Sequence, residues 1–121
     1  MSQTTTKVKP AVTRSIRLNW RVTRVLIADG NAVSREIREA QLRAAGIIVS
    51  VARTGFEAIV KASCQVPDVI LIDDSLSDIE PAETGRLLTT CPMTAHIPVV
   101  RLVRGRRLPR RMLTRLCQVA S

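Results

Sequence analysis

Short apolar stretches recur along residues 22–103, and four of them have the length and β-branched content of buried strands. They are VTRVLIADG (22–30), IIVSVA (47–52), VILID (69–73) and VVRLV (99–103). The first and third end near an aspartate, Asp29 and Asp73. From the pattern alone, these two acids could hold a divalent cation, supply a nucleophile or only cap strand ends.

Amphipathic stretches separate these strands and predict helices over 31–46, 56–65 and 81–90. The first has apolar positions at Val33, Ile37, Leu42 and Ala45, and the second has Phe56, Ile59, Val60 and Ser63 on one face. Strands that alternate with helices through short connections predict a parallel sheet covered on both faces, which is a doubly wound α/β fold. In such sheets, functional sites lie at the carboxyl ends of the strands.

Charge is distributed unevenly along the chain. The net charge of +9 comes from residues 1–23 with five cations and no acid, residues 24–97 with seven cations and ten acids, and residues 98–121 with seven cations and no acid. We therefore expect a flexible basic N-terminal extension over 1–23 and one domain over 24–121. The basic ends indicate an anionic partner. Sixteen of the nineteen cations are arginine, which binds phosphates and guanine edges through paired hydrogen bonds.

Composition argues against several classes of function. Trp20 and Phe56 are the only aromatic residues, which disfavours base stacking on aromatic platforms. Three cysteines without a CxxC pair suit a reducing, cytoplasmic compartment. Cys91 and His96 are too few ligands for a metal site, so we expect no metal and no required cofactor. We also expect no membrane insertion, no secretory signal and no enzymatic activity, because the corresponding patterns do not occur in the sequence.

The order VLIADGN, helix, PDVILID and HIPVV resembles the receiver domain of two-component response regulators over about residues 24–103. The resemblance implies a flavodoxin-like fold. It also implies that Asp73 stands at the phosphoacceptor position and Asp29 at the first of the two acids that precede it.

Several positions depart from the receiver pattern. Gly30 stands where the second acid, a direct magnesium ligand, is expected, and Val103 stands where the switch hydroxyl is expected. No lysine follows Lys61, although the receiver pattern has one after the fifth strand. Phosphoryl transfer needs a metal and a cation to neutralise the developing charge. The departures therefore predict a vestigial phosphoacceptor site at Asp29 and Asp73.

The C-terminal part is shorter than the receiver pattern requires. Only eighteen residues follow VVRLV, and LPRRMLTRLCQVA (108–120) predicts a single helix with Pro109 in its first turn. The fourth strand then becomes an exposed edge. The same part of the chain carries seven arginines: Arg101, Arg104, Arg106, Arg107, Arg110, Arg111 and Arg115. Arginines that converge near a helix N-terminus suit a compact ligand with several phosphates.

A receiver-like domain with these departures and an arginine-rich segment resembles the CheY-like cyclic di-GMP effectors of flagellated bacteria. The resemblance implies that the seven arginines bind cyclic di-GMP as a regulatory ligand, with a ligand-linked dimer as one arrangement. It also implies that the bound protein engages the flagellar motor switch or another signalling protein to modulate motility and attachment. Two alternatives stay open: nonspecific binding of nucleic acid through both basic ends, and an adaptor that meets an acidic protein surface without nucleotide.

Overall fold

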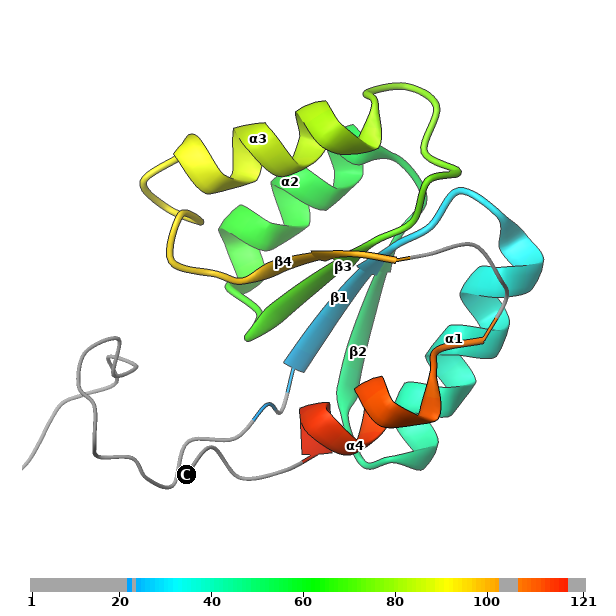
Figure 1. Ribbon diagram of the computed structural model, residues 1–121. Coiled ribbons are helices and arrows are strands. Elements are labelled where there is room, and N and C mark those ends of the chain that lie inside the picture. Colours follow the sequence, from blue (N-terminus) through cyan, green and yellow to red (C-terminus); the bar gives the residue numbers. More distant parts are fainter. Residues whose placement is uncertain (1–21, 23, 103–106, 118–121) are drawn as a thin grey trace, which may run out of the picture.

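The computed structural model describes residue 22, residues 24–102 and residues 107–117, and these form a parallel sheet between helices (Figure 1). The sheet has the strand order β2-β1-β3-β4. Its strands are β1 (Arg24–Ala28), β2 (Ile48–Ala52), β3 (Val69–Ile72) and β4 (Val99–Arg101). All three neighbouring pairs are parallel, so the predicted doubly wound α/β fold is confirmed.

Helices cover both faces of the sheet. They are α1 (Ala32–Ala44), α2 (Gly55–Gln65), α3 (Pro81–Thr90) and α4 (Arg110–Cys117). α2 and α3 lie on one face, and α1 and α4 lie on the other (Figure 1). Local sequence explains where the first three begin: the side chains of Asn31 and Thr54 accept hydrogen bonds from the first turns of α1 and α2, and Pro81 opens α3. None of the described helices is long and apolar enough to cross a bilayer.

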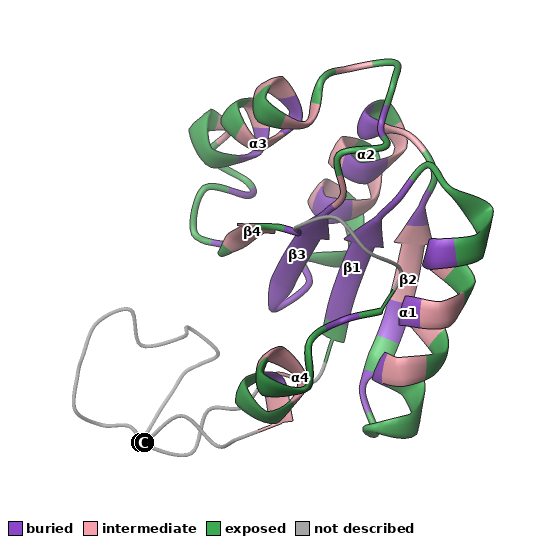
Figure 2. Ribbon diagram, turned by 45° about the vertical axis from the view of Figure 1, so that its right-hand side comes forward, coloured by how far each residue is buried: buried purple, intermediate pink, exposed green. Residues whose placement is uncertain are grey.

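The two faces of the sheet form two hydrophobic clusters around the buried central strands β1 and β3 (Figure 2). On the α1 and α4 side the buried members are Val25, Ile27, Leu42, Ile47, Val49, Val69, Leu71, Leu102, Leu108 and Leu116. Every residue of β3 is buried, because this strand has a neighbour on each side and helices above and below.

The predicted apolar face of α2 is only partly correct: Ile59 packs against the hydrophobic cluster on the α2 and α3 side, but Phe56 and Val60 do not. Phe56 and Val60 are 66% and 44% exposed, whereas Gly55, Ala58 and Ala62 are buried. Small residues let α2 approach the sheet and α3 closely, so burial here follows side-chain size rather than hydrophobicity alone. Around α1 the apolar positions of the sequence pattern also divide: Leu42 is buried, whereas Val33 and the C-cap residue Ala45 are exposed. The other buried positions of α1 are the polar residues Ser34 and Arg38.

The bounds of the C-terminal elements differ from the prediction. β4 ends at Arg101 instead of 103, and α4 begins at Arg110 instead of 108. The structure describes α4 as far as Cys117, so the predicted end of this helix at 120 lies outside the described residues. Among the described residues no fifth strand follows, and β4 is an edge of the sheet. The proposed extension over 1–23 lies outside the described residues, apart from Val22, which packs against the cluster on the α1 and α4 side.

Candidate functional site

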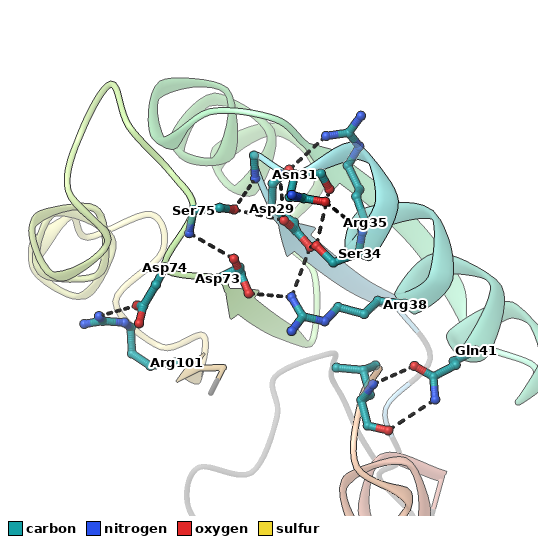
Figure 3. Close-up of polar contacts among 12 residues, drawn as sticks. Asp29, Asn31, Ser34, Arg35, Arg38, Gln41, Asp73, Asp74, Ser75 and Arg101 are labelled. Atoms are coloured by element: carbon teal, nitrogen blue, oxygen red, sulfur yellow. Dashed lines mark hydrogen bonds and ion pairs between the residues drawn. The ribbon is translucent and has the colours of Figure 1, made fainter. Parts of the chain in front are cut away.

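An acidic pocket lies at the carboxyl ends of β1 and β3. These strands are neighbours in register, so Asp29 and Asp73, which follow them, come to the same edge of the sheet. Arg38 of α1 reaches between them: its Nη1 atom lies 3.0 Å from Asp29 Oδ2 and 2.6 Å from Asp73 Oδ1 (Figure 3). The side chains of Arg38 and Asp29 are 1% and 0% exposed. One buried guanidinium thus neutralises part of the charge of two carboxylates.

Both carboxylate oxygens of Asp29 accept hydrogen bonds from the protein. Oδ1 accepts from the backbone N–H of Asn31 at 2.9 Å and from the hydroxyl of Ser75 at 3.0 Å. Oδ2 accepts from the hydroxyl of Ser34 at 2.6 Å and from Arg38. A buried carboxylate is stable when its oxygens are satisfied in this way.

Both oxygens of Asp73 are engaged as well. Oδ1 accepts from Arg38, and Oδ2 accepts from the backbone N–H of Ser75 at 2.9 Å. Burial works to raise the pKa of Asp73, but the hydrogen bonds from Arg38 and Ser75, with the charge of Arg38, outweigh burial and hold the pKa below its ordinary value. The Asp73 carboxyl is therefore held ionised and in a fixed orientation.

Gly30 fits the pocket because it has no side chain. A Cβ atom at this position would lie 2.7 Å from the backbone oxygen of Ser75, and the Gly30 N–H donates to the Ser75 hydroxyl at 2.8 Å. An acid at position 30 would require the loop after β3 to shift. The described residues contain no group of three or more His, Cys, Asp or Glu side chains that could hold a metal ion. The donor set therefore does not fit a magnesium-dependent phosphoacceptor site.

A groove of about 750 Å³ lies on the opposite side of the sheet from α2 and α3, beside α4. It is lined by Leu71, Val100, Pro109, Arg110, Arg111, Met112, Arg115 and Leu116. Leu71 and Val100 are partners in the β3–β4 register, so adjacent strands supply its apolar floor. The volume lies in the range of pockets that hold small molecules, roughly 300–1,000 Å³.

Three of the seven candidate arginines come together at this groove: Arg110, Arg111 and Arg115. Arg107 is exposed and is not among the lining residues. Arg104 and Arg106 lie outside the described residues.

Arg101 lies at the end of β4 and is not among the groove-lining residues, and its Nη2 atom is 2.8 Å from Asp74 Oδ1 (Figure 3). Both side chains of this pair are about half exposed, at 48% and 54%. The pair sits at the same edge of the sheet as the acidic pocket. Among the described candidate arginines, Arg101 is thus the one that pairs with the residue next to Asp73.

Sequence reasoning missed the residues that complete the acidic pocket, above all Arg38, Ser34 and Ser75. The signal for the first two was the spacing: Ser34, Arg38 and Leu42 are each four residues apart and therefore lie on one face of a helix. A basic residue at the centre of a buried helix face indicates a buried counter-charge. Ser75 carried a weaker signal, its place two residues after Asp73.

Comparisons with known proteins connect the chain to response regulators, although no protein-family model matches it. It is 35% identical over 77 residues to the response regulator PleD of Caulobacter vibrioides, covering 64% of this chain and 17% of the relative. It is 34% identical over 77 residues to the gliding motility regulatory protein of Myxococcus xanthus, covering 64% of this chain and 10% of the relative. The chain thus matches only a small part of these proteins.

Solved structures agree with this relationship. The chemotaxis response regulator CheY4 of Vibrio cholerae superposes with a TM-score of 0.62 at 25% identity, covering 66% of this chain and 67% of that one. A response regulator structure from Chloroflexus aurantiacus gives 0.63 at 27% identity, covering 67% and 66%. A receiver from Methanoculleus marisnigri gives 0.65 at 24% identity over 68% and 67%, which shows the fold alone. The chain has the receiver fold and is similar to response regulators over about two thirds of its length.

Proposed function

We propose that this receiver homologue is a non-enzymatic signalling effector that responds to cyclic di-GMP rather than to phosphorylation. A role in signalling follows from the homology with receiver domains. The observation that carries the finer proposal is the groove in which Arg110, Arg111 and Arg115 are combined with apolar side chains. The described residues of its lining are cations and apolar groups, without a nucleophile or an acid among them, which favours binding over catalysis.

Independence from phosphorylation is supported by the acidic pocket. Arg38 already neutralises Asp73, and Gly30 supplies no metal ligand. A phosphoryl group on Asp73 would bring additional negative charge next to Asp29, whose oxygens already accept four hydrogen bonds. No cation beyond Arg38 is described within ion-pair distance of these two acids to offset that charge.

Cyclic di-GMP is the ligand whose chemistry suits the groove best. It offers two phosphates and two guanine edges, all of which arginine binds through paired hydrogen bonds. Arg111 and Arg115 are four residues apart on α4 and therefore project from one face. The floor formed by Leu71 and Val100 can contact a flat base, so aromatic residues are not needed. Arg104, Arg106 and Arg107 precede α4 and complete the proposed cationic set.

The proposed output is engagement of a partner such as the flagellar motor switch, which would modulate motility and attachment from the cytoplasm. One relative carries the name of a gliding motility regulator, and one solved structure of the same fold is the receiver domain of a modulated diguanylate cyclase. These names concern those proteins and give the proposal its context. The edge strand β4 favours a ligand-linked dimer, since an unpaired strand edge can pair with a second copy.

Calorimetric titration tests the ligand directly. Wild type is titrated with cyclic di-GMP, GTP and a short DNA duplex, and so are two double variants, Arg111→Ala/Arg115→Ala and Arg43→Ala/Arg86→Ala. The second double variant also removes two arginines, but these stand at exposed positions on α1 and α3, outside the groove. Selective binding of cyclic di-GMP by wild type and the control, with at least a tenfold loss in the groove variant, supports the proposal.

Two other outcomes would replace the proposal. Comparable duplex affinity in all three proteins, with a steep dependence on salt, would favour nonspecific nucleic-acid binding. Absence of nucleotide binding in wild type would leave the adaptor interpretation, in which the same arginines contact an acidic protein surface. Sedimentation with and without cyclic di-GMP tests the dimer.

A further inference from the structure

The side chain of Gln41 joins α1 to the residue that precedes the arginine-bearing helix. Its Oε1 atom accepts a hydrogen bond from the Leu108 N–H at 2.6 Å, and its Nε2 atom donates to the Leu108 carbonyl at 3.2 Å. Figure 3 shows the amide facing this backbone segment, on the same helix as Arg38. One side chain thus satisfies both polar backbone groups of a residue 67 positions away.

This contact is important because few other described interactions hold α4 against the rest of the domain. The helix has eight residues, and an isolated helix of that length is not stable in water. Arg107, Arg110, Arg111 and Arg115 carry like charges in a short segment, and repulsion between neighbours such as Arg111 and Arg115 destabilises the helix. Its apolar contacts come mainly from Met112, Leu113 and Leu116.

Leu108 is the fixed point from which α4 starts. Its side chain is 3% exposed within the cluster on the α1 and α4 side, and Pro109 accepts the first hydrogen bonds of α4 from Met112 and Leu113. A buried amide and carbonyl without partners would be costly, so the Gln41 bonds determine where Leu108 can sit. Because these bonds involve a neutral amide, they do not depend on the charge of the arginines.

We propose that Gln41 is a positioning residue for the groove: it sets the place and register of α4 against β3 and β4. Arg111 and Arg115 take their positions from the start of this helix, so Gln41 acts on the ligand through them. The consequence for ligand affinity rests on the function proposed above. The role of Gln41 in placing α4 is independent of that function, and a separate experiment measures it.

Hydrogen–deuterium exchange of the full chain tests the placement. The variant is Gln41→Ala, which leaves α1 intact because alanine favours helix. The matched control is Gln65→Ala, which removes a glutamine whose Oε1 accepts from the Ser50 hydroxyl far from α4. We expect amides of 113–117 to exchange about five- to tenfold faster in Gln41→Ala, with α3 unchanged, and both helices unchanged in the control.

The same proteins are then titrated with cyclic di-GMP, and the affinity of Gln41→Ala should fall by a similar factor. If wild type does not bind the nucleotide, the proposed ligand is wrong, yet selective loss of α4 protection still supports the positioning role. Equal exchange of α4 in all three proteins would overturn it. Faster exchange of α3 to the same extent as α4 would also overturn it, because Gln41 would then support global stability alone.

Discussion

The guanidinium of Arg38 lies 2.6 Å from the carboxylate of Asp73, the residue to which the resemblance to receivers assigns the phosphoacceptor position. The same guanidinium contacts Asp29, so a side chain of α1 provides the cation that the site needs for its own stability. In this chain Arg38, Asp29 and Asp73 form a largely buried ion-pair network. This network joins α1 to the ends of β1 and β3.

Replacing Arg38 by methionine should strongly destabilise the domain. The substitution leaves the fully buried Asp29 and the largely buried Asp73 close together without their shared counter-charge. Removing one member of a buried ion pair typically costs about 3–5 kcal/mol of unfolding free energy. Urea denaturation followed by circular dichroism measures this loss.

Two further variants test whether the loss of stability comes from the unpaired buried acids. Arg43→Met removes an exposed arginine that pairs with Glu39 on the same helix and should change stability by no more than about 0.5 kcal/mol. The triple variant Arg38→Met/Asp29→Asn/Asp73→Asn removes the charges together and should recover part of the loss. A loss below about 1 kcal/mol in Arg38→Met would show that water or another group compensates the acids.

Acid should weaken the domain through Asp73. Its folded pKa is below its unfolded value, so the ionised carboxylate contributes stability that is fully present above the ordinary value of 3.8 and is lost as pH falls through the folded pKa. Unfolding free energies of wild type and Asp73→Asn, measured between neutral pH and about pH 3, should therefore converge on acidification. A constant difference across this range would mean that Asp73 does not titrate differently in the two states.

The two acids at the strand ends were predictable from the sequence, whereas Arg38, the side chain that pairs with both, was not. Asp29 and Asp73 follow strongly apolar stretches, and parallel strands bring such residues to one edge. Arg38 was missed because a charged residue in an amphipathic helix is ordinarily assigned to the solvated face. Its burial depends on tertiary pairing with two acids in other elements, which hydrophobic periodicity does not contain.

The sequence shows that the C-terminal part is rich in arginine, but it does not show which of these arginines line the groove and which lie elsewhere. Arg101 and Arg110 are nine positions apart, yet only the second lines the groove: Arg101 ends β4, whereas Arg110 follows Leu108, which is hydrogen-bonded to Gln41 of α1. Nothing in the charge pattern marks this difference. The groove floor also depends on β3 and β4 being neighbours, which follows from topology rather than from local pattern.

Magnesium should not stabilise the wild-type protein, and small phosphoryl donors should not label Asp73. All four carboxylate oxygens of Asp29 and Asp73 already accept hydrogen bonds, so a cation would have to displace Arg38. Thermal unfolding with and without millimolar magnesium measures the first effect, and mass spectrometry after incubation with phosphoramidate measures the second. In Arg38→Met the released oxygens should bind magnesium, so that its unfolding midpoint rises with the ion. Stable labelling of wild-type Asp73 would contradict phosphorylation independence.

Replacing a helical glycine by alanine should change the stability of the protein in opposite directions at two positions, Gly85 and Gly55. Gly85 lies inside α3, and a Cβ atom there would have Val99 Cγ1 at 3.9 Å as its nearest neighbour, an ordinary contact. Gly85→Ala should therefore stabilise the protein by about 0.5–1 kcal/mol, because alanine loses less backbone entropy in a helix.

Gly55 opens α2, where a Cβ atom would lie 2.5 Å from Thr84 Oγ1 and 3.0 Å from Ile79 Cβ. Thr84 is fully buried, so it has little room to move. Gly55→Ala should destabilise the domain by about 1–3 kcal/mol through overpacking between α2 and α3. Chemical denaturation of the two variants side by side measures both effects with the same added methyl group. Equal effects of the two substitutions would mean that α2 and α3 are not packed as closely as the buried small residues of α2 require.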